Sequence, residues 1–313
     1  MKEKILLIST NYFLTPPNGY GGIERIVSLA YKYYSERGYD VDVISKEGSE
    51  YHTYNHQELQ IINFNNYKFI LVYKYDQATL QFFDSLNLRN IYVILQNNYS
   101  EKLNFINTIK NLRFGILSKE QENQFKKHIQ KPFIYMPNSI DTKRFIDNNE
   151  TRDKDIAYIG SIGQHKSPLT CLDYAIKHNL TINFYGPLWF TDDEKTYEKE
   201  FLSKLKSYDK AKLLGECNDN EKINILNEHK YFIFLAGVDK EQWSEPFGIA
   251  PLEAMSCGCT VITHYKKGGH VSFCNDSNSI SYEEPPKQLN PNDVRESILH
   301  LDYRNIFSKY YPQ

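Results

Sequence analysis

Short apolar segments alternate with longer amphipathic segments along nearly the whole chain. The apolar segments are rich in Ile, Val, Phe and Tyr, which is typical of buried strands. The amphipathic segments have the spacing of helices that bury one face. Because strands that alternate with helices build parallel sheets with crossover connections, the pattern predicts an α/β fold.

The first half of the chain carries one complete series of this alternation. The clearest helix is expected at 23–37, where Gly38 provides the C-terminal cap. Helices are expected between several of the strands. The predicted strands of this half are 5–9, 41–45, 69–73, 91–95, 114–117 and 133–136.

A second series begins after a polar, turn-forming stretch from Pro137-Asn-Ser-Ile-Asp141 to Asp153. We expect two domains, 1–145 and 146–290, and a helical tail at 291–313 whose docking the sequence does not assign. Two parallel-sheet domains in tandem predict a cleft between them. The second series is expected to have strands at 155–160, 181–185, 211–214, 231–235 and 260–263, and helices at 168–178, 192–206, 219–228 and 249–257.

Composition and charge narrow the class of partner. A net charge of −2 over 313 residues argues against a nucleic-acid-binding protein, which needs an excess of basic residues, but leaves small anionic ligands open. The apolar stretch at 5–8 is too short for a signal-peptide core, and no later stretch has the length of a membrane span. The five cysteines form no zinc pattern. Reduced thiols are typical of a cytoplasmic protein, which is the location we expect.

The most informative segment is Glu245-Pro-Phe-Gly-Ile-Ala-Pro-Leu-Glu253. Pro251 fits only the first turn of a helix, so the helix should begin near Gly248. A helix start that follows a parallel strand offers N–H donors and a positive dipole to an anion. The two carboxylates can accept hydrogen bonds from sugar hydroxyls. The same spacing is also that of an ordinary amphipathic helix with a solvated glutamate near its start.

This segment resembles the signature of retaining glycosyltransferases of family 4, the glycosyl transferases group 1. The resemblance implies a GT-B architecture, with two Rossmann-like domains and an interdomain cleft for a nucleotide-sugar donor. It implies that Glu245 lies by the donor sugar and that Glu253 binds the ribose hydroxyls. The backbone at Phe247, Gly248, Ile249 and Ala250 would meet the sugar and the distal phosphate.

Further matches to the family occur in the expected order. Lys166, after Tyr158-Ile-Gly160, resembles the lysine that neutralises the diphosphate. Gly21 and Gly22 resemble a Gly-Gly-x-Glu motif whose backbone approaches the donor phosphates. Taken alone, each of these matches is weak, since a mobile loop or a surface lysine would look the same. The remaining matches are Gly186 at the end of a strand and Pro137-Asn-Ser-Ile-Asp141 as the interdomain connection.

The sequence also departs from the family pattern. Ser161 stands where an arginine is usual, so a phosphate charge is missing or is supplied by His165 or by Lys166 alone. Where a histidine often lies near the donor sugar, the chain has Gln96, Asn97 and Asn98, which can hydrogen-bond but cannot titrate near neutral pH. Gly268-Gly269-His270 stands where Gly-Gly is often followed by Glu. Acceptor-side candidates are these amides and the aromatic residues Tyr12, Phe13, Tyr20 and Tyr99.

The resemblance implies a reaction and its participants. A hexose-type sugar would pass with retention from a nucleoside-diphosphate sugar, with uracil favoured as the base, to a hydroxyl of a glycan, lipid-linked or small-molecule acceptor. Lys166 and Glu245 are the predicted catalytic residues, with Ser161 and Gly186 on the donor side. No metal and no other cofactor are expected, because members of the family generally need no metal and no Asp-x-Asp motif ends a strand. Asp192-Asp193 lies at a predicted helix start, where acidic residues are expected in any case.

The sequence is also compatible with other functions. The same architecture serves sugar-nucleotide epimerases and phosphorylases, since a fold does not determine a reaction. Ser161 and the missing histidine would also suit a nucleotide-sugar-binding protein without catalysis. A nicotinamide dehydrogenase is disfavoured because no Gly-x-Gly-x-x-Gly follows the first strand. Peripheral contact with a membrane is left open by the family's lipid-linked acceptors, although 119–131 reads as a solvated face.

Overall fold

The computed structural model describes residues 2–98, 100–149 and 151–313. The chain divides into two compact units, unit 1 (Met1–Ser139 and Leu301–Gln313) and unit 2 (Ile140–His300). Within the described ranges, the strands form two six-stranded sheets, one in each unit, and every strand pairing is parallel. The predicted α/β class is confirmed.

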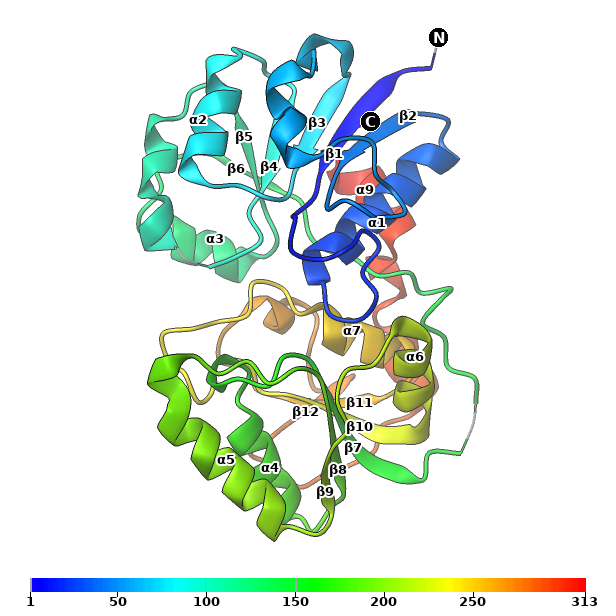
Figure 1. The fold of residues 1–313 in the computed structure, drawn as a ribbon. Helices are drawn as coiled ribbons and strands as arrows, with labels where there is room; N and C mark the ends of the chain where they lie inside the picture. Colours follow the sequence, from blue (N-terminus) through cyan, green and yellow to red (C-terminus); the bar gives the residue numbers. More distant parts are fainter. Residues whose placement is uncertain (1, 99, 150) are drawn as a thin grey trace. The chain divides into compact units, whose positions relative to one another are not determined.

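The sheet of unit 1 has the strand order β2-β1-β3-β4-β5-β6 (Figure 1). All the strands predicted in this half are present, displaced by no more than a residue at most ends. The strands are β1 (Lys4–Ile8), β2 (Asp40–Ile44), β3 (Phe69–Val72), β4 (Ile91–Ile94), β5 (Arg113–Ile116) and β6 (Phe133–Tyr135). The helices are α1 (Gly22–Glu36), α2 (Gln77–Ser85), α3 (Lys119–Phe125) and α9 (Tyr303–Tyr310), with short 3₁₀ segments η1 (His56–Ile61), η2 (Phe64–Asn66) and η3 (Ser100–Thr108).

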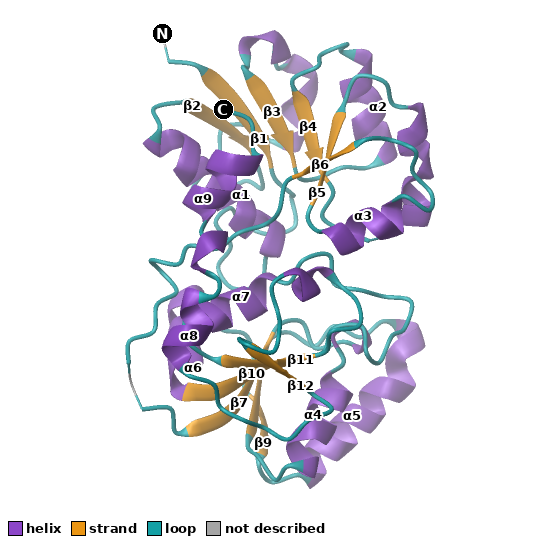
Figure 2. Cartoon of the chain, turned by 180° about the vertical axis from the view of Figure 1, so that it is seen from behind, coloured by secondary structure: helices purple, strands orange, loops and turns teal. Residues whose placement is uncertain are grey.

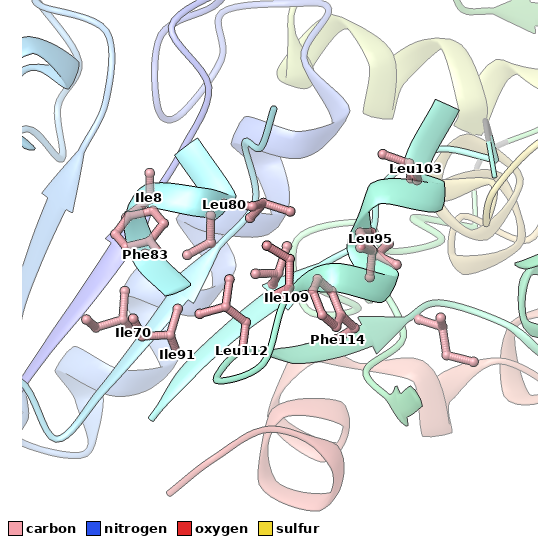
Figure 3. Packing of buried hydrophobic residues seen from close by; sticks show 14 of the residues in the cluster. Ile8, Ile70, Leu80, Phe83, Ile91, Leu95, Leu103, Ile109, Leu112 and Phe114 are labelled. Carbon is pink, nitrogen blue, oxygen red and sulfur yellow. The ribbon is translucent and has the colours of Figure 1, made fainter. Parts of the chain in front are cut away.

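Helices cover both faces of this sheet because successive side chains of each strand point to opposite faces. On one face, Ile8 and Ile70 pack with Leu80 and Phe83 of α2 (Figure 3). Buried residues of η3 and α3 belong to the same cluster. α1 packs against β1 and β2 and is also in contact with α9.

The C-terminal helix α9 completes unit 1 by packing on α1. The Phe307 ring stacks on the Tyr33 ring with centroids 5.4 Å apart. The Tyr34 hydroxyl donates to the Pro312 carbonyl at 2.8 Å, and the Tyr311 hydroxyl donates to the Met136 carbonyl at 3.2 Å. The tail that the sequence left without a docking site is therefore an integral part of this unit, with α1 and α9 side by side in Figures 1 and 2.

The sheet of unit 2 has the strand order β12-β11-β10-β7-β8-β9 (Figure 1). All the strands predicted here are confirmed, and β12 is an additional edge strand. The strands are β7 (Lys154–Ile159), β8 (Ile182–Tyr185), β9 (Ala211–Leu213), β10 (His229–Phe234), β11 (Thr260–Thr263) and β12 (Ser279–Ser281). The helices are α4 (Pro168–Lys177), α5 (Lys195–Ser207), α6 (Asp219–Glu228), α7 (Ile249–Ser256) and α8 (Pro291–Glu296). The 3₁₀ segments are η4 (Gln164–Lys166), η5 (Asp192–Glu194), η6 (Gly269–Ser272) and, before α9, η7 (Leu299–Leu301).

The helices of unit 2 also divide between two faces. Buried residues of α4 and α5 pack with β7, β8 and β10 in one apolar cluster. α6 and α7 pack against β10 from the other face, and α8 packs on α7. Because each helix follows a parallel strand, the helix starts gather at the carboxyl edge of the sheet, which is where ligands bind in folds of this kind. No helix in the described ranges is long and apolar enough to cross a membrane.

Candidate functional site

Three loops at the carboxyl edge of the unit 2 sheet are joined by backbone hydrogen bonds. The loop after β7 and the loop after β10 meet where the Gly237 amide donates to the His165 carbonyl at 2.9 Å. The loop after β11 joins them where the Gly269 amide donates to the Glu245 carbonyl at 2.7 Å. These bonds bring together residues that lie far apart in the sequence.

The two predicted catalytic residues form an ion pair. Lys166 ends η4 and its ammonium donates to Glu245 Oε2. The side chains are 18% and 15% exposed, so both are partly shielded from water yet reachable. The ammonium also lies 4.8 Å from the centre of the Trp243 ring, a cation–π contact that fixes its direction. Trp243 is a residue whose role the sequence did not reveal.

His165, the other basic candidate after β7, is packed beside Trp243 and Lys166. Its ring packs edge-on against Trp243, with centroids 5.1 Å apart. Burial, followed by the charge of Lys166, lowers the pKa of His165 to about 4, so the ring is neutral at neutral pH. The Ser161 hydroxyl is buried and lies 3.3 Å from His165 Nε2. Of the two basic residues after β7, His165 and Lys166, the lysine is the one that carries a charge at neutral pH.

The helix that follows Glu245 begins where the sequence predicted. Gly248 is the N-cap residue of α7, and Ile249 and Ala250 are its first two residues. The first N–H groups of a helix have no acceptor within the helix, so this start can donate to an anion. Phe247 is buried and its ring packs against Phe273, with centroids 5.5 Å apart, so the Phe247 side chain anchors the segment. Contact of its backbone with a donor stays a prediction.

Two glycines permit the close packing of this edge. Gly186, at the end of β8, has φ 146°, and a Cβ atom there would lie 1.8 Å from the Gly160 carbonyl oxygen. A Cβ atom on Gly269 would lie 2.1 Å from the Pro246 carbonyl oxygen. A side chain at either position would force the loops after neighbouring strands apart.

Glu253 lies on α7, one turn further than the helix start, and is only 2% exposed. Its Oε2 accepts from the ammonium of Lys222 on α6 at 3.0 Å. This partner could not be predicted from motifs, because Lys222 belongs to no recognisable motif and lies 31 residues before Glu253. Only the packing of α6 beside α7 on β10 joins them.

In unit 1, the predicted glycine motif forms the start of α1. Gly21 is the N-cap residue and Gly22 the first helical residue. Glu24 is buried and accepts a hydrogen bond from the Thr10 hydroxyl, which ties the helix to the loop after β1. Burial raises the pKa of Glu24. Tyr20 packs edge-on against Phe13, with ring centroids 5.6 Å apart. The contact of Gly21 and Gly22 with a donor stays a prediction.

The amide candidates follow β4 in unit 1. Gln96 forms a reciprocal pair with Asn138, in which each side-chain NH₂ donates to the other's oxygen at 3.2 and 3.1 Å. The Asn97 carbonyl accepts from the Gln121 side chain at 3.0 Å, and Asn98 is half-buried. The Gln96 side chain is thus held in place within unit 1. Tyr99 lies outside the described residues.

A family model decides the class of protein. The model described as "Glycosyl transferases group 1" matches residues 139–303, a little more than half of the chain. The chain belongs to this family. The glycosyltransferase assignment applies to unit 2 above all, since that unit contains nearly all of the matched residues. No curated protein sequence matches the chain.

Solved structures resemble this glycosyltransferase over almost its whole length. Sucrose-phosphate synthase from Thermosynechococcus elongatus has a TM-score of 0.75 and 13% identity, covering 97% of this chain and 96% of that one. AviGT4, a glycosyltransferase involved in avilamycin A biosynthesis, has a TM-score of 0.71 and 15% identity, with 98% and 96% covered. Anabaena Alr3699/HepE in complex with UDP and glucose has a TM-score of 0.63 and 14% identity, with 99% and 95% covered. At such identities the likeness shows the fold, the GT-B architecture of two Rossmann-like domains.

Proposed function

We propose that this glycosyltransferase is a retaining enzyme of family 4 that transfers a hexose-type sugar from a UDP-sugar to a hydroxyl of a glycan, lipid-linked or small-molecule acceptor. The observation that carries the proposal is the Lys166–Glu245 pair beside the start of α7. A cation, a row of N–H donors and a carboxylate in one place suit a diphosphate attached to a sugar.

The proposed roles follow from the charges that develop during transfer. As the bond between the anomeric carbon and the diphosphate breaks, negative charge grows on the distal phosphate, and Lys166 and the amides of Gly248, Ile249 and Ala250 stabilise it. Glu245 accepts hydrogen bonds from sugar hydroxyls while the ring gains positive charge. The acceptor oxygen bonds to the anomeric carbon on the face that the diphosphate leaves, and its proton passes to a phosphate oxygen. We assign no covalent nucleophile.

The choice of a UDP-sugar as the donor is supported by the similarity of the fold to solved structures that contain UDP or UDP-glucose. Alr3699/HepE structures hold UDP and UDP-glucose.

In the described part of the chain, no group of three or more His, Cys, Asp and Glu residues is placed to hold a metal ion. We propose metal-independent transfer at a cytoplasmic site, with peripheral contact to the membrane where the acceptor is lipid-linked.

A nucleotide panel tests the function. The thermal unfolding of the protein is measured with UDP, GDP, ADP and the UDP-sugars, since a ligand at a hundred times its Kd stabilises by about 2.7 kcal/mol. UDP and at least one UDP-sugar should raise the midpoint. The active sugar is then incubated with acceptors in EDTA, and the anomeric configuration of the product is determined. The proposal is contradicted if no nucleotide or UDP-sugar raises the unfolding midpoint, or if the product has the inverted anomeric configuration.

A second candidate function is nucleotide-sugar binding without catalysis. It is favoured by the neutral His165 and by the buried Ser161, which leave Lys166 as the charged group after β7. Under this function the protein would bind UDP-sugars but release no UDP with any acceptor. Release of UDP by the wild-type protein, and its loss in a Glu245→Ala variant that still folds, would exclude it. Conversion of the donor sugar without transfer would instead indicate an epimerase.

A further inference from the structure

The carboxylate proposed for the ribose is paired with a buried lysine on a neighbouring helix. Lys222 Nζ lies 3.0 Å from Glu253 Oε2, and the two side chains are 9% and 2% exposed. Lysine is almost never buried unless it is paired, because an ammonium taken out of water loses its hydration. The pairing with Glu253 therefore explains why Lys222 can be buried at this place.

The position of Lys222 on its own helix is intrinsically unfavourable. Lys222 stands in the first turn of α6, whose start is fixed by a capping box between Asn218 and Glu221. The N-terminal end of a helix carries partial positive charge, which disfavours a cation there. The helix start does not require this lysine for its stability, so the contacts of Lys222 account for its position.

Lys222 stands in the middle of a row of alternating charges. Its ammonium is 3.8 Å from Asp219 Oδ1 in addition to Glu253, and Asp219 Oδ2 lies 3.0 Å from the guanidinium of Arg144. Arg144 is 47% exposed, whereas Asp219 is 9% exposed. The row runs from the solvent to Glu253 and places Lys222 as the direct contact of that carboxylate.

This pair borders the carboxyl edge of the sheet where the candidate donor residues lie. Lys222 stands in the first turn of α6, and Asn218, the N-cap residue of this helix, ends the loop after β9. Cys217 is part of the loop after β9, in which the Gly215 carbonyl accepts from the Gly186 amide at 2.8 Å. The pair is thus connected through this loop to Gly186, one of the predicted donor residues.

We propose that Lys222 is a positioning residue for the ribose of the donor and gives the site its preference for ribonucleotides. It supplies the counter-charge to Glu253 and fixes the direction of the carboxylate, so that the ribose hydroxyls meet an oriented acceptor. A carboxylate has about four lone-pair sites, so the bond from one ammonium leaves capacity for hydroxyl donors. The inference rests on the proposed function and on the ribose-binding role that the family resemblance implies for Glu253.

The test compares a nucleotide with its deoxy forms in the full-length protein. Kd values are measured by calorimetry for UDP, 2′-deoxy-UDP and 3′-deoxy-UDP with the wild type, Lys222→Met and Lys222→Arg. A site built to bond a hydroxyl rejects the analogue that lacks it. We expect the wild type to bind at least one deoxy form about 10-fold or more weakly than UDP, which is the loss of one charge-assisted bond. In Lys222→Met this ratio should fall to about 3-fold or less, and Lys222→Arg should restore part of it.

Two controls separate positioning from structural support. Lys230→Met removes another partly buried lysine of unit 2, which pairs with Asp155 at 3.1 Å, and should leave the ratio unchanged. The double variant Lys222→Met/Glu253→Gln removes both charges of the buried pair together, so it retains no unpaired carboxylate. Its ratio should equal that of Glu253→Gln alone, because Lys222 acts through Glu253.

The outcomes assign any failure to one proposal. A wild type that binds no nucleoside diphosphate overturns both the proposed function and this inference. A wild type that binds UDP and both deoxy forms equally overturns this inference alone. The same holds if Lys222→Met weakens all three ligands by one common factor, since that is the effect of lost structural support.

Discussion

The Lys166–Glu245 pair leads to a prediction in which the two partners behave oppositely. A phosphate that binds Lys166 must share or displace Glu245, which already accepts from the ammonium. Lys166→Met removes the attraction, and Glu245→Gln removes the competitor. We therefore expect the first substitution to weaken UDP binding and the second to strengthen it, although Glu245→Gln should slow sugar transfer.

The magnitudes follow from burial and charge. Two unit charges about 4 Å apart interact by about 4 kcal/mol at an effective dielectric constant of about 20. The Lys166 ammonium must loosen its bond to Glu245 to bind the phosphate, which offsets part of this attraction. The net contribution of one charge-assisted hydrogen bond is about 1.5 to 3 kcal/mol. Lys166→Met should therefore raise the Kd for UDP by about 10- to 150-fold. Glu245→Gln should lower it by about 3- to 10-fold, which is about 0.7 to 1.4 kcal/mol.

Calorimetric titration with UDP at constant ionic strength measures both effects. Lys154→Met is a matched control, because Lys154 pairs with Glu228 at an exposed place, where the side chains are 42% and 40% exposed. That variant should leave the Kd for UDP unchanged. If Glu245→Gln weakens UDP binding as strongly as Lys166→Met does, the pair is a structural element of the loops and the reasoning is refuted.

Further predictions concern stability, each measured as a free energy of unfolding in urea. Gly186→Ala should destabilise by about 2 to 5 kcal/mol, because its Cβ would lie 1.8 Å from the Gly160 carbonyl oxygen, and a near-normal value would refute that contact. Arg152→Met should destabilise by about 3 to 5 kcal/mol, because it removes buried hydrogen bonds to three backbone carbonyls and takes the cationic partner from the Asp147 carboxylate. The folded-state pKa of His165, about 4, lies below its unfolded value of about 6.5, so the unfolded chain binds a proton first as the pH falls. The stability that comes from burying the neutral ring is therefore complete above about pH 6.5 and is lost as the pH falls toward 4. His165→Gln should reduce the fall in stability over this window by about 1.4 kcal/mol per pH unit, and an unchanged slope would contradict the neutral ring. Phe307→Ala should destabilise by about 3 to 5 kcal/mol because the ring is fully buried, whereas a loss below 1 kcal/mol would mean that α9 is not part of the core.

The sequence predicted the elements well wherever a local pattern determines them. Buried parallel strands are continuous apolar runs, and each such run became a strand. The start of α7 was found because Pro251 is restricted to a first helical turn. β12 was missed because Ser279-Ile-Ser281 offers a single apolar residue, and its strand conformation comes from pairing with β11 at the sheet edge.

Only part of the candidate site could be predicted from the sequence. The carboxylates and Lys166 stand in motifs of fixed spacing, so they could be named. Their partners could not be, because Trp243 and Lys222 reach them through contacts between different loops and helices. The neutral state of His165 could not be predicted either, since it depends on burial against the loop after β10. Motif spacing identifies the groups that meet a ligand, while tertiary packing determines the groups that orient them.

The return of α9 to unit 1 affects the order in which the protein can form during synthesis. The ribosome releases residues 140–300 before residues 301–313, so unit 2 is available as a continuous segment while unit 1 still lacks a helix. Domains generally fold as units when their residues have emerged. Until Phe307 arrives, the Tyr33 ring has no stacking partner from α9 and this face of α1 is open to other apolar surfaces. We therefore expect nascent chains stalled near residue 300 to be bound by chaperones through α1.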